Sequence, residues 1–153
     1  MSTAQVTLAD NIRIEVRDAT TGEVLHVQEH RNLVVNAGLN LIRDFLDGDA
    51  PTAPSHFAYG TGTTAVSATQ TALVSQVGSR DVFTSKVGTG AQQQVYTYYL
   101  TSGTANGNTL GEVGLFNAAS GGTMLARAVL SPTIVKTASI AVTFTWTINL
   151  GAS

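Results

Sequence analysis

The chain has 153 residues, no cysteine and a net charge of −2. This length predicts a single domain large enough for a hydrophobic core, and the lack of cysteine excludes disulfides and thiolate metal sites. Without a basic block we expect no nucleic-acid partner. Its apolar runs are shorter than the roughly 18 residues that span a bilayer, so we expect no membrane partner. The first residues do not resemble a signal peptide, so we expect synthesis in the cytoplasm.

Charged residues are scarce and unevenly placed. They make up 12% of the chain, against roughly 25% in ordinary globular domains. Twelve of the eighteen lie in the first 49 residues. The six others are Arg80, Asp81, Lys86, Glu112, Arg127 and Lys136. A surface with so little charge opposes self-association weakly, which predicts that neighbouring molecules cover much of it.

Residues 5–30 predict a β-hairpin. Apolar residues at 12, 14 and 16 alternate with charged residues at 13, 15 and 17, as in a strand with one buried and one solvent-exposed face. Thr21-Gly22 supplies the turn, and Val24–Gln28 returns. We expect residues 1–31 to form a hairpin or arm able to reach a neighbour. Residues 32–153 are expected to form the rest of one compact unit.

One short α-helix is predicted at about residues 37–47. Asn36 is suited to the N-cap, Gly48 to the position after the helix, and Pro51 to ending it. The predicted apolar stripe consists of Leu39, Ile42, Phe45 and Leu46.

The remainder predicts a mainly β fold. Short strands separated by Gly-rich turns favour an antiparallel β-sandwich or a jelly-roll-like barrel over alternating strands and helices. The expected strands cover 56–59, 80–87, 93–101, 110–117, 124–130 and 140–150, with a turn at 88–90 and a helical turn at 73–77. In the last strand the predicted inward face consists of Ile140, Val142, Phe144, Trp146, Ile148 and Leu150.

Motifs for cofactors, metals and catalysis are weak. Residues 60–65 fit the G-x-G-x-x-A dinucleotide pattern, but neither a helical stripe nor a suitably placed acid follows, so we expect a glycine turn and no cofactor. Asp44, Asp47 and Asp49 lack the distal glutamate of a calcium loop. The three histidines have no metal-ligand spacing, and no G-x-S-x-G elbow occurs. We therefore expect no metal and nominate no catalytic residue.

Glu112 is the last acidic residue of the chain, in an otherwise apolar segment that includes Phe116. A buried carboxylate is costly unless it is paired, so we expect an ion pair with Arg80, Arg127 or Lys136. A general acid or base is the alternative, although no second carboxylate is at hand.

Three tyrosines, Tyr96, Tyr98 and Tyr99, lie close together on one predicted strand. Aromatic side chains on a strand are usually part of the core or of an interface. The alternative is a sugar-binding platform.

Several segments occur in an order that resembles a group of tailed-bacteriophage virion proteins. They are Asn32–Gly38, Phe57–Gly62, Thr69–Leu73, Arg80, Glu112–Asn117 and Gly122–Arg127. The chain is similar over about residues 32–150 to small head-decoration (cement) proteins and, more distantly, to the N-terminal attachment domains of phage tail fibres. It departs from the fibre pattern at Gln76, where an acid often precedes the arginine. That departure puts an ion pair at this position in doubt.

The resemblance implies a non-enzymatic virion protein that binds the major capsid protein and itself on the outer head surface. We expect a homotrimer, since closed symmetry would cover the uncharged surface. No shaft-like repeat follows, which favours the head over the tail. The alternatives are a tail or baseplate adaptor, a receptor-binding tail-fibre protein, and a carbohydrate-binding or carbohydrate-cleaving β domain that contacts host glycans. The structural or interface candidates are Glu112, Arg80, Arg127, Phe116, Trp146, Tyr96 and Tyr98.

Overall fold

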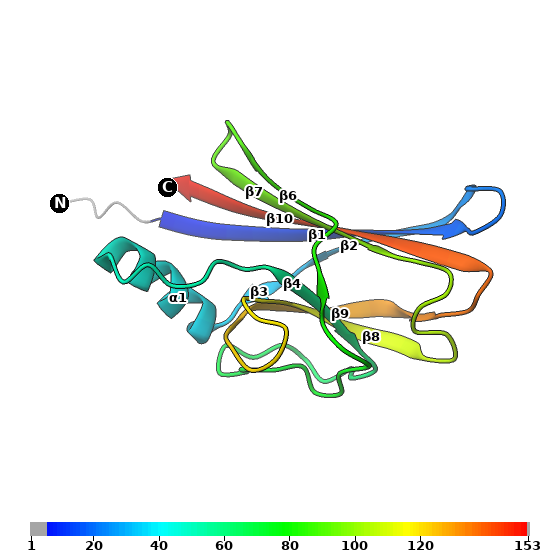
Figure 1. Ribbon diagram of the computed structural model, residues 1–153. Helices are drawn as coiled ribbons and strands as arrows, with labels where there is room; N and C mark the ends of the chain where they lie inside the picture. Colours follow the sequence, from blue (N-terminus) through cyan, green and yellow to red (C-terminus); the bar gives the residue numbers. More distant parts are fainter. Residues whose placement is uncertain (1–5, 153) are drawn as a thin grey trace.

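The computed structural model describes residues 6–152, which form two antiparallel five-stranded sheets with one helix at an end (Figure 1). The first sheet has the order β2-β1-β10-β7-β6, and the second the order β3-β9-β8-β4-β5. The elements are β1 (Val6–Asp18), β2 (Val24–Arg31), β3 (Leu33–Val34), α1 (Asn36–Asp47), β4 (His56–Gly60), β5 (Asp81–Val82), β6 (Ser85–Thr89), β7 (Gln93–Leu100), β8 (Thr109–Phe116), β9 (Met124–Val135) and β10 (Ile140–Ala152). The predicted β-sandwich is confirmed. Over the described range both sheets are open, so no closed barrel forms.

The N-terminal hairpin belongs to the first sheet. Strand β1 pairs with β10 along its whole length, from Val6 opposite Ala152 to Asp18 opposite Ile140. Its inward residues Ile12 and Ile14 are completely buried. The hairpin was predicted correctly, but it is not a separate arm, because its apolar face is part of the sandwich core.

The chain crosses from the second sheet to the first between Val82 and Ser85. The single strand predicted over 80–87 is in fact two, because β5 pairs with β4 in the second sheet and β6 with β7 in the first. Buried Phe83 lies at the crossing. The turn was predicted at residues 88–90, but β6 continues to Thr89, so the turn begins later in the chain than predicted. The helical turn predicted at 73–77 is absent, and Gln76 instead bridges to Gly60.

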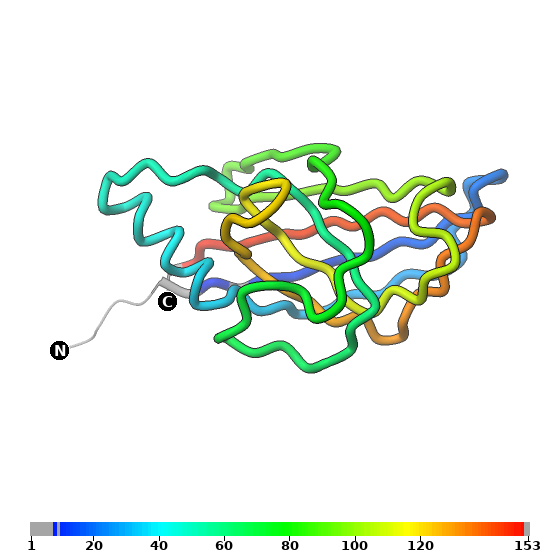
Figure 2. Tube along the Cα trace, turned by 60° about the horizontal axis from the view of Figure 1, so that its bottom comes forward, coloured from blue at the N-terminus to red at the C-terminus, as the bar shows by residue number. Residues whose placement is uncertain are grey.

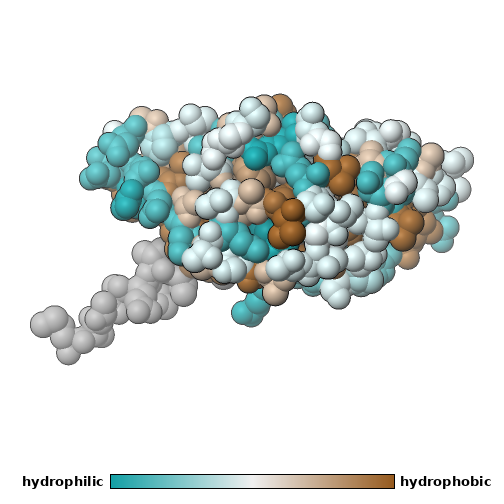
Figure 3. All heavy atoms as spheres, turned by 90° about the horizontal axis from the view of Figure 1, so that it is seen from below, coloured by the Kyte–Doolittle hydropathy of each residue, from teal (hydrophilic) through white to brown (hydrophobic). Residues whose placement is uncertain are grey.

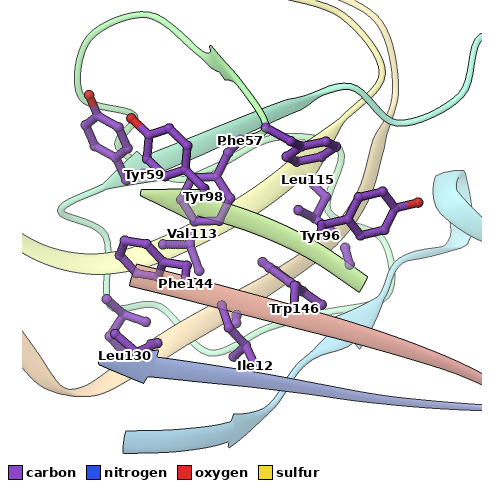
Figure 4. Packing of buried hydrophobic residues seen from close by; sticks show 14 of the residues in the cluster. Ile12, Phe57, Tyr59, Tyr96, Tyr98, Val113, Leu115, Leu130, Phe144 and Trp146 are labelled. Carbon is purple, nitrogen blue, oxygen red and sulfur yellow. The ribbon is translucent and has the colours of Figure 1, made fainter. Parts of the chain in front are cut away.

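Aromatic rings from both sheets meet in the core (Figure 4). Phe57 of β4 stacks on Tyr98 of β7 with ring centroids 4.6 Å apart, and lies 4.9 Å from Phe144 of β10. Trp146 is completely buried. The inward face predicted for β10 is therefore confirmed at its centre, whereas Leu150 near the strand end is 45% exposed.

The helix begins and ends almost where the sequence predicted. Gly48 has φ 88°, and its N–H binds the last turn of α1, as expected for a glycine after a helix. The N-cap, however, is Val35 rather than Asn36, and no side chain caps the first turn. That turn receives tertiary support instead, since the Asn36 N–H donates to the carbonyl of Ala68 at 2.8 Å.

The buried face of α1 differs from the predicted stripe. Gly38 and Leu41 face the sandwich, while Leu39 and Leu46 are 43% and 86% exposed. A Cβ on Gly38 would overlap the carbonyl group of Leu125, so the helix backbone lies directly against β9 there. This close approach, available only to glycine, determines the orientation of the helix.

Candidate interaction site

Glu112 and Arg127 form a fully buried ion pair between neighbouring strands β8 and β9. Neither side chain has exposed area, and Arg127 Nε donates to Glu112 Oε2 at 2.8 Å. Arg127 Nη2 also lies 2.8 Å from Oε2, but the geometry of this contact is not that of a hydrogen bond. Of the three cations predicted as partners for Glu112, Arg127 is the one that pairs.

The Glu112 carboxylate also accepts backbone hydrogen bonds from the loop that follows β4. Oε1 accepts from the N–H of Gly62 at 3.2 Å and of Ser75 at 2.6 Å, and Oε2 accepts from Val74 at 3.0 Å. Charge-assisted bonds of this kind are stronger than neutral ones. One carboxylate therefore fastens both ends of the loop to the second sheet.

Arg127 holds the middle of the same loop. Its Nη1 donates to the carbonyl of Thr64 at 2.8 Å and to Oε1 of Gln70 at 3.2 Å. The ion pair therefore contacts the loop over residues 62–75. Because its charges and most of its polar atoms are occupied internally, the pair stabilises a loop conformation and offers no free acid or base.

Glycines allow the loop to approach the carboxylate closely. A Cβ on Gly62 would lie 2.5 Å from Glu112 Oε1, and one on Gly111 would lie 2.7 Å from the Gly62 carbonyl oxygen. A Cβ on Gly60 would overlap the Ser75 carbonyl. The glycines of the G-x-G pattern thus provide space for a side-chain carboxylate, not for a bound pyrophosphate.

The outer surface of this loop carries no charge. Residues 61–79, which we call the loop platform, contain only Thr, Gly, Ala, Val, Ser, Gln and Leu, and most of them are exposed. The loop platform lies on the outer side of the second sheet (Figures 1 and 2). Viewed from that side, this part of the surface is mostly of intermediate hydropathy, and a hydrophilic group gathers over α1 (Figure 3).

Arg80 connects the loop platform to a second uncharged loop at residues 117–123. Its guanidinium carbon lies 3.6 Å from the centre of the Phe116 ring, and Nη1 donates to the carbonyls of Ala118 and Gly121. Its Nε donates to Oε1 of Gln76 at 3.3 Å. The doubt about an ion pair at Gln76 was justified, since a neutral hydrogen bond takes its place. Arg80 does not pair with Glu112.

Lys136 is likewise not a partner of Glu112. Its Nζ donates to the carbonyls of Ser102 and Thr137 and to Oδ1 of Asn106, at 2.9–3.2 Å. The side chain is completely buried, and this burial lowers its pKa. Lys136 therefore stabilises the loop between β7 and β8, away from the ion pair.

The three tyrosines do not form a common platform. Tyr96 and Tyr98 face the core and are each 6% exposed, whereas Tyr99 is on the outer face and is 47% exposed. The Tyr98 hydroxyl donates to the Asp81 carboxylate, and burial raises the pKa of that tyrosine. The alternation of side chains along β7 separates the residues proposed to bind a sugar.

No metal centre is found among residues 6–152, where no three His, Cys, Asp or Glu side chains gather closely enough to hold an ion. In the same range, the helix is not long and apolar enough to cross a membrane. What the structure brings together is the Glu112–Arg127 ion pair, Arg80 and two neutral loops.

The sequence identified Glu112, Arg127, Arg80 and Phe116 but missed the loop platform they support. The signal available for it was an uncharged run, residues 50–79, that contains the loop. Its hydrogen bonds use backbone N–H groups of Gly62, Val74 and Ser75, which no residue pattern marks. Comparison with models of known protein families, with characterised proteins and with solved structures found no match.

Proposed function

We propose that this chain is a structural protein of a tailed-bacteriophage virion, a decoration protein that binds across the subunits of the head. The observation that carries the proposal is the loop platform, an exposed uncharged surface held rigidly by the Glu112–Arg127 pair. The sequence resemblance to phage decoration proteins supplies the biological setting. The platform is proposed as the surface that meets the capsid.

An uncharged, preorganised surface suits a permanent contact. The centres of protein interfaces are depleted in charged residues, because each charge must be stripped of water on binding. A loop already fixed in the free protein loses little conformational entropy when a partner covers it. On a shell, many copies of such a modest contact add up across the particle.

The distribution of charge suggests an orientation. Arg13, Glu15 and Arg17 of β1 lie on the outer face of the first sheet, where both arginines contact Glu15. The loop platform lies on the opposite side of the sandwich (Figures 1 and 2). We propose that the charged sheet faces solvent and the platform faces the particle.

A structural role also fits the chemistry of the one buried acid. Glu112 accepts hydrogen bonds at both oxygens and pairs with Arg127, so it has no free position for a substrate. We therefore propose no catalytic activity for it.

Binding to particles tests the proposal. Ala72 is exposed in the loop platform, and Ser85 is exposed on β6 in the other sheet. With particles that lack this protein, Ala72→Glu should abolish binding while the matched control Ser85→Glu binds normally. Equal binding by both variants would mean that the platform is not the contact.

Copy number separates the head from the tail. Densitometry of complete particles should give hundreds of copies of a decoration protein. A handful would instead support the alternative of a tail or baseplate component. Sedimentation of the purified protein tests the proposed homotrimer.

A further inference from the structure

Helix α1 leaves an open groove at one end of the sandwich. The helix backbone touches β9 at Gly38, and Leu41 is 5% exposed, so this first half is firmly packed. Further along, Phe45 is 45% and Leu46 is 86% exposed. Figure 1 shows the helix extending past the sandwich, beside the start of β1 and the end of β10. The second half of α1 therefore lacks the cover that an apolar helix face usually has.

The groove is apolar and of limited size. Its volume is about 220 Å³, and it is lined by Leu41, Ile42, Phe45, Tyr96, Ile148 and Leu150, with Pro54, Gln94 and Leu125 completing it. Pockets for drug-sized ligands are larger, roughly 300–1,000 Å³. A volume below that range suits one large apolar side chain, the kind of anchor that dominates many protein interfaces.

Acidic groups lie around this end of the molecule. Asp47 and Asp49 occur at the end of α1, where Arg43, the only cation of the helix, pairs with Asp44. Asp10 is opposite Ile148, a groove residue, in the β1–β10 pairing. Its Oδ1 is buried and has no hydrogen-bond partner among residues 6–152. A buried carboxylate oxygen without a partner is costly, so a cation brought beside it would be favourable.

We propose that this groove binds a peptide segment of a partner protein in which a large apolar side chain is flanked by lysine or arginine. The apolar side chain would fill the groove. The basic residues would pair with Asp10, Asp47 and Asp49. This site is at the end of the sandwich and does not depend on the function proposed for the loop platform.

Fluorescence polarisation with the full chain tests the proposal. The probe is a fluorescein-labelled peptide of about ten residues with a central phenylalanine and two lysines on either side. Two matched peptides replace the phenylalanine by alanine or the lysines by glutamate. We expect each replacement to weaken binding about tenfold or more, since both the anchor and the charge contribute.

Variants of the protein locate the binding. Phe45→Ser and Leu150→Ser remove groove-lining side chains that are already half-exposed, and each should weaken binding about tenfold. Leu46→Ser is the matched control on the same helix, because Leu46 does not line the groove, and its affinity should stay within about twofold of the wild type. Asp10→Asn should weaken binding and reduce its dependence on salt.

Two results would overturn the proposal. One is the absence of measurable binding, or equal binding of all three peptides. The other is a wild-type dimer in sedimentation that Phe45→Ser converts to monomer, because the occupant would then be a second copy of this chain. Neither result bears on the loop platform, whose particle binding is measured separately with Ala72→Glu.

Discussion

Glu112 and Arg127 are joined by a 2.8 Å hydrogen bond, and neither side chain is exposed to solvent. Replacing Glu112 by Gln leaves the guanidinium buried without a counter-ion, a change that typically costs about 3–5 kcal/mol. We expect a loss of this size in the free energy of unfolding, measured by urea denaturation with circular dichroism. Glu29→Gln is the control, because its side chain is 59% exposed and 3.8 Å from Arg13, and it should change stability little. If Glu112→Gln lowers the free energy of unfolding no more than Glu29→Gln does, the buried pair contributes little to stability.

Gly62 is expected to tolerate no side chain. An alanine Cβ would lie 2.5 Å from Glu112 Oε1, and the carboxylate cannot move away without breaking its bonds to the loop. We expect Gly62→Ala to destabilise the protein by about 1–3 kcal/mol, the usual range for overpacking. Gly90→Ala, with no atom within 4 Å of the new Cβ, serves as the control in the same thermal unfolding measurement. A Gly62→Ala variant as stable as Gly90→Ala would contradict the close packing described above.

Trp146 should be the most sensitive position tested in the core. Truncation to alanine removes a completely buried indole and leaves a cavity, which costs about 3–5 kcal/mol. Its Nε1 is buried without a hydrogen-bond partner in the described structure, so Trp146→Phe, which removes that polar group, should cost clearly less. Chemical denaturation of both variants tests this order. Unchanged stability of Trp146→Ala would mean that the inward face of β10 is wrongly assigned.

Asp10 should make stability depend on pH near neutrality. Burial raises its pKa from 3.8 to about 6 in the folded protein. Because the folded-state pKa is the higher one, the stabilising contribution of this carboxyl is complete below about pH 4 and is lost as pH rises through about 6. We expect Asp10→Asn to match the wild type near pH 4.5 and to be more stable than it at pH 7.5.

The wild type must be compared with Asp10→Asn because His30 changes the stability with pH in the opposite direction. Burial lowers the pKa of His30 from 6.5, so its contribution is lost as pH falls. Both variants retain His30, and the difference between their unfolding free energies therefore isolates Asp10. A difference that stays constant between pH 4.5 and pH 7.5 would be evidence against a raised pKa.

Sequence periodicity predicted the strands well where one face is buried and the other is exposed to solvent. In β1 and β10, alternation identified Ile12, Ile14, Phe144 and Trp146 as inward residues, and all four are completely buried. It was less successful for α1, where Leu39 is apolar but exposed and Gly38 is buried. The face a helix buries depends on how closely its backbone can approach a neighbour, and that property belongs to the packed pair.

The sequence alone determined a mainly β chain with few charges. It also determined that Glu112, an acidic residue in an apolar segment, needs a cationic partner. Both conclusions follow from residue type and local spacing. Only the tertiary structure decided that the cation is Arg127 rather than Arg80 or Lys136. It also decided that an uncharged loop rests on the resulting pair. Strand pairing and the path of a loop bring together groups 37 to 63 residues apart in sequence, and no local pattern encodes those contacts.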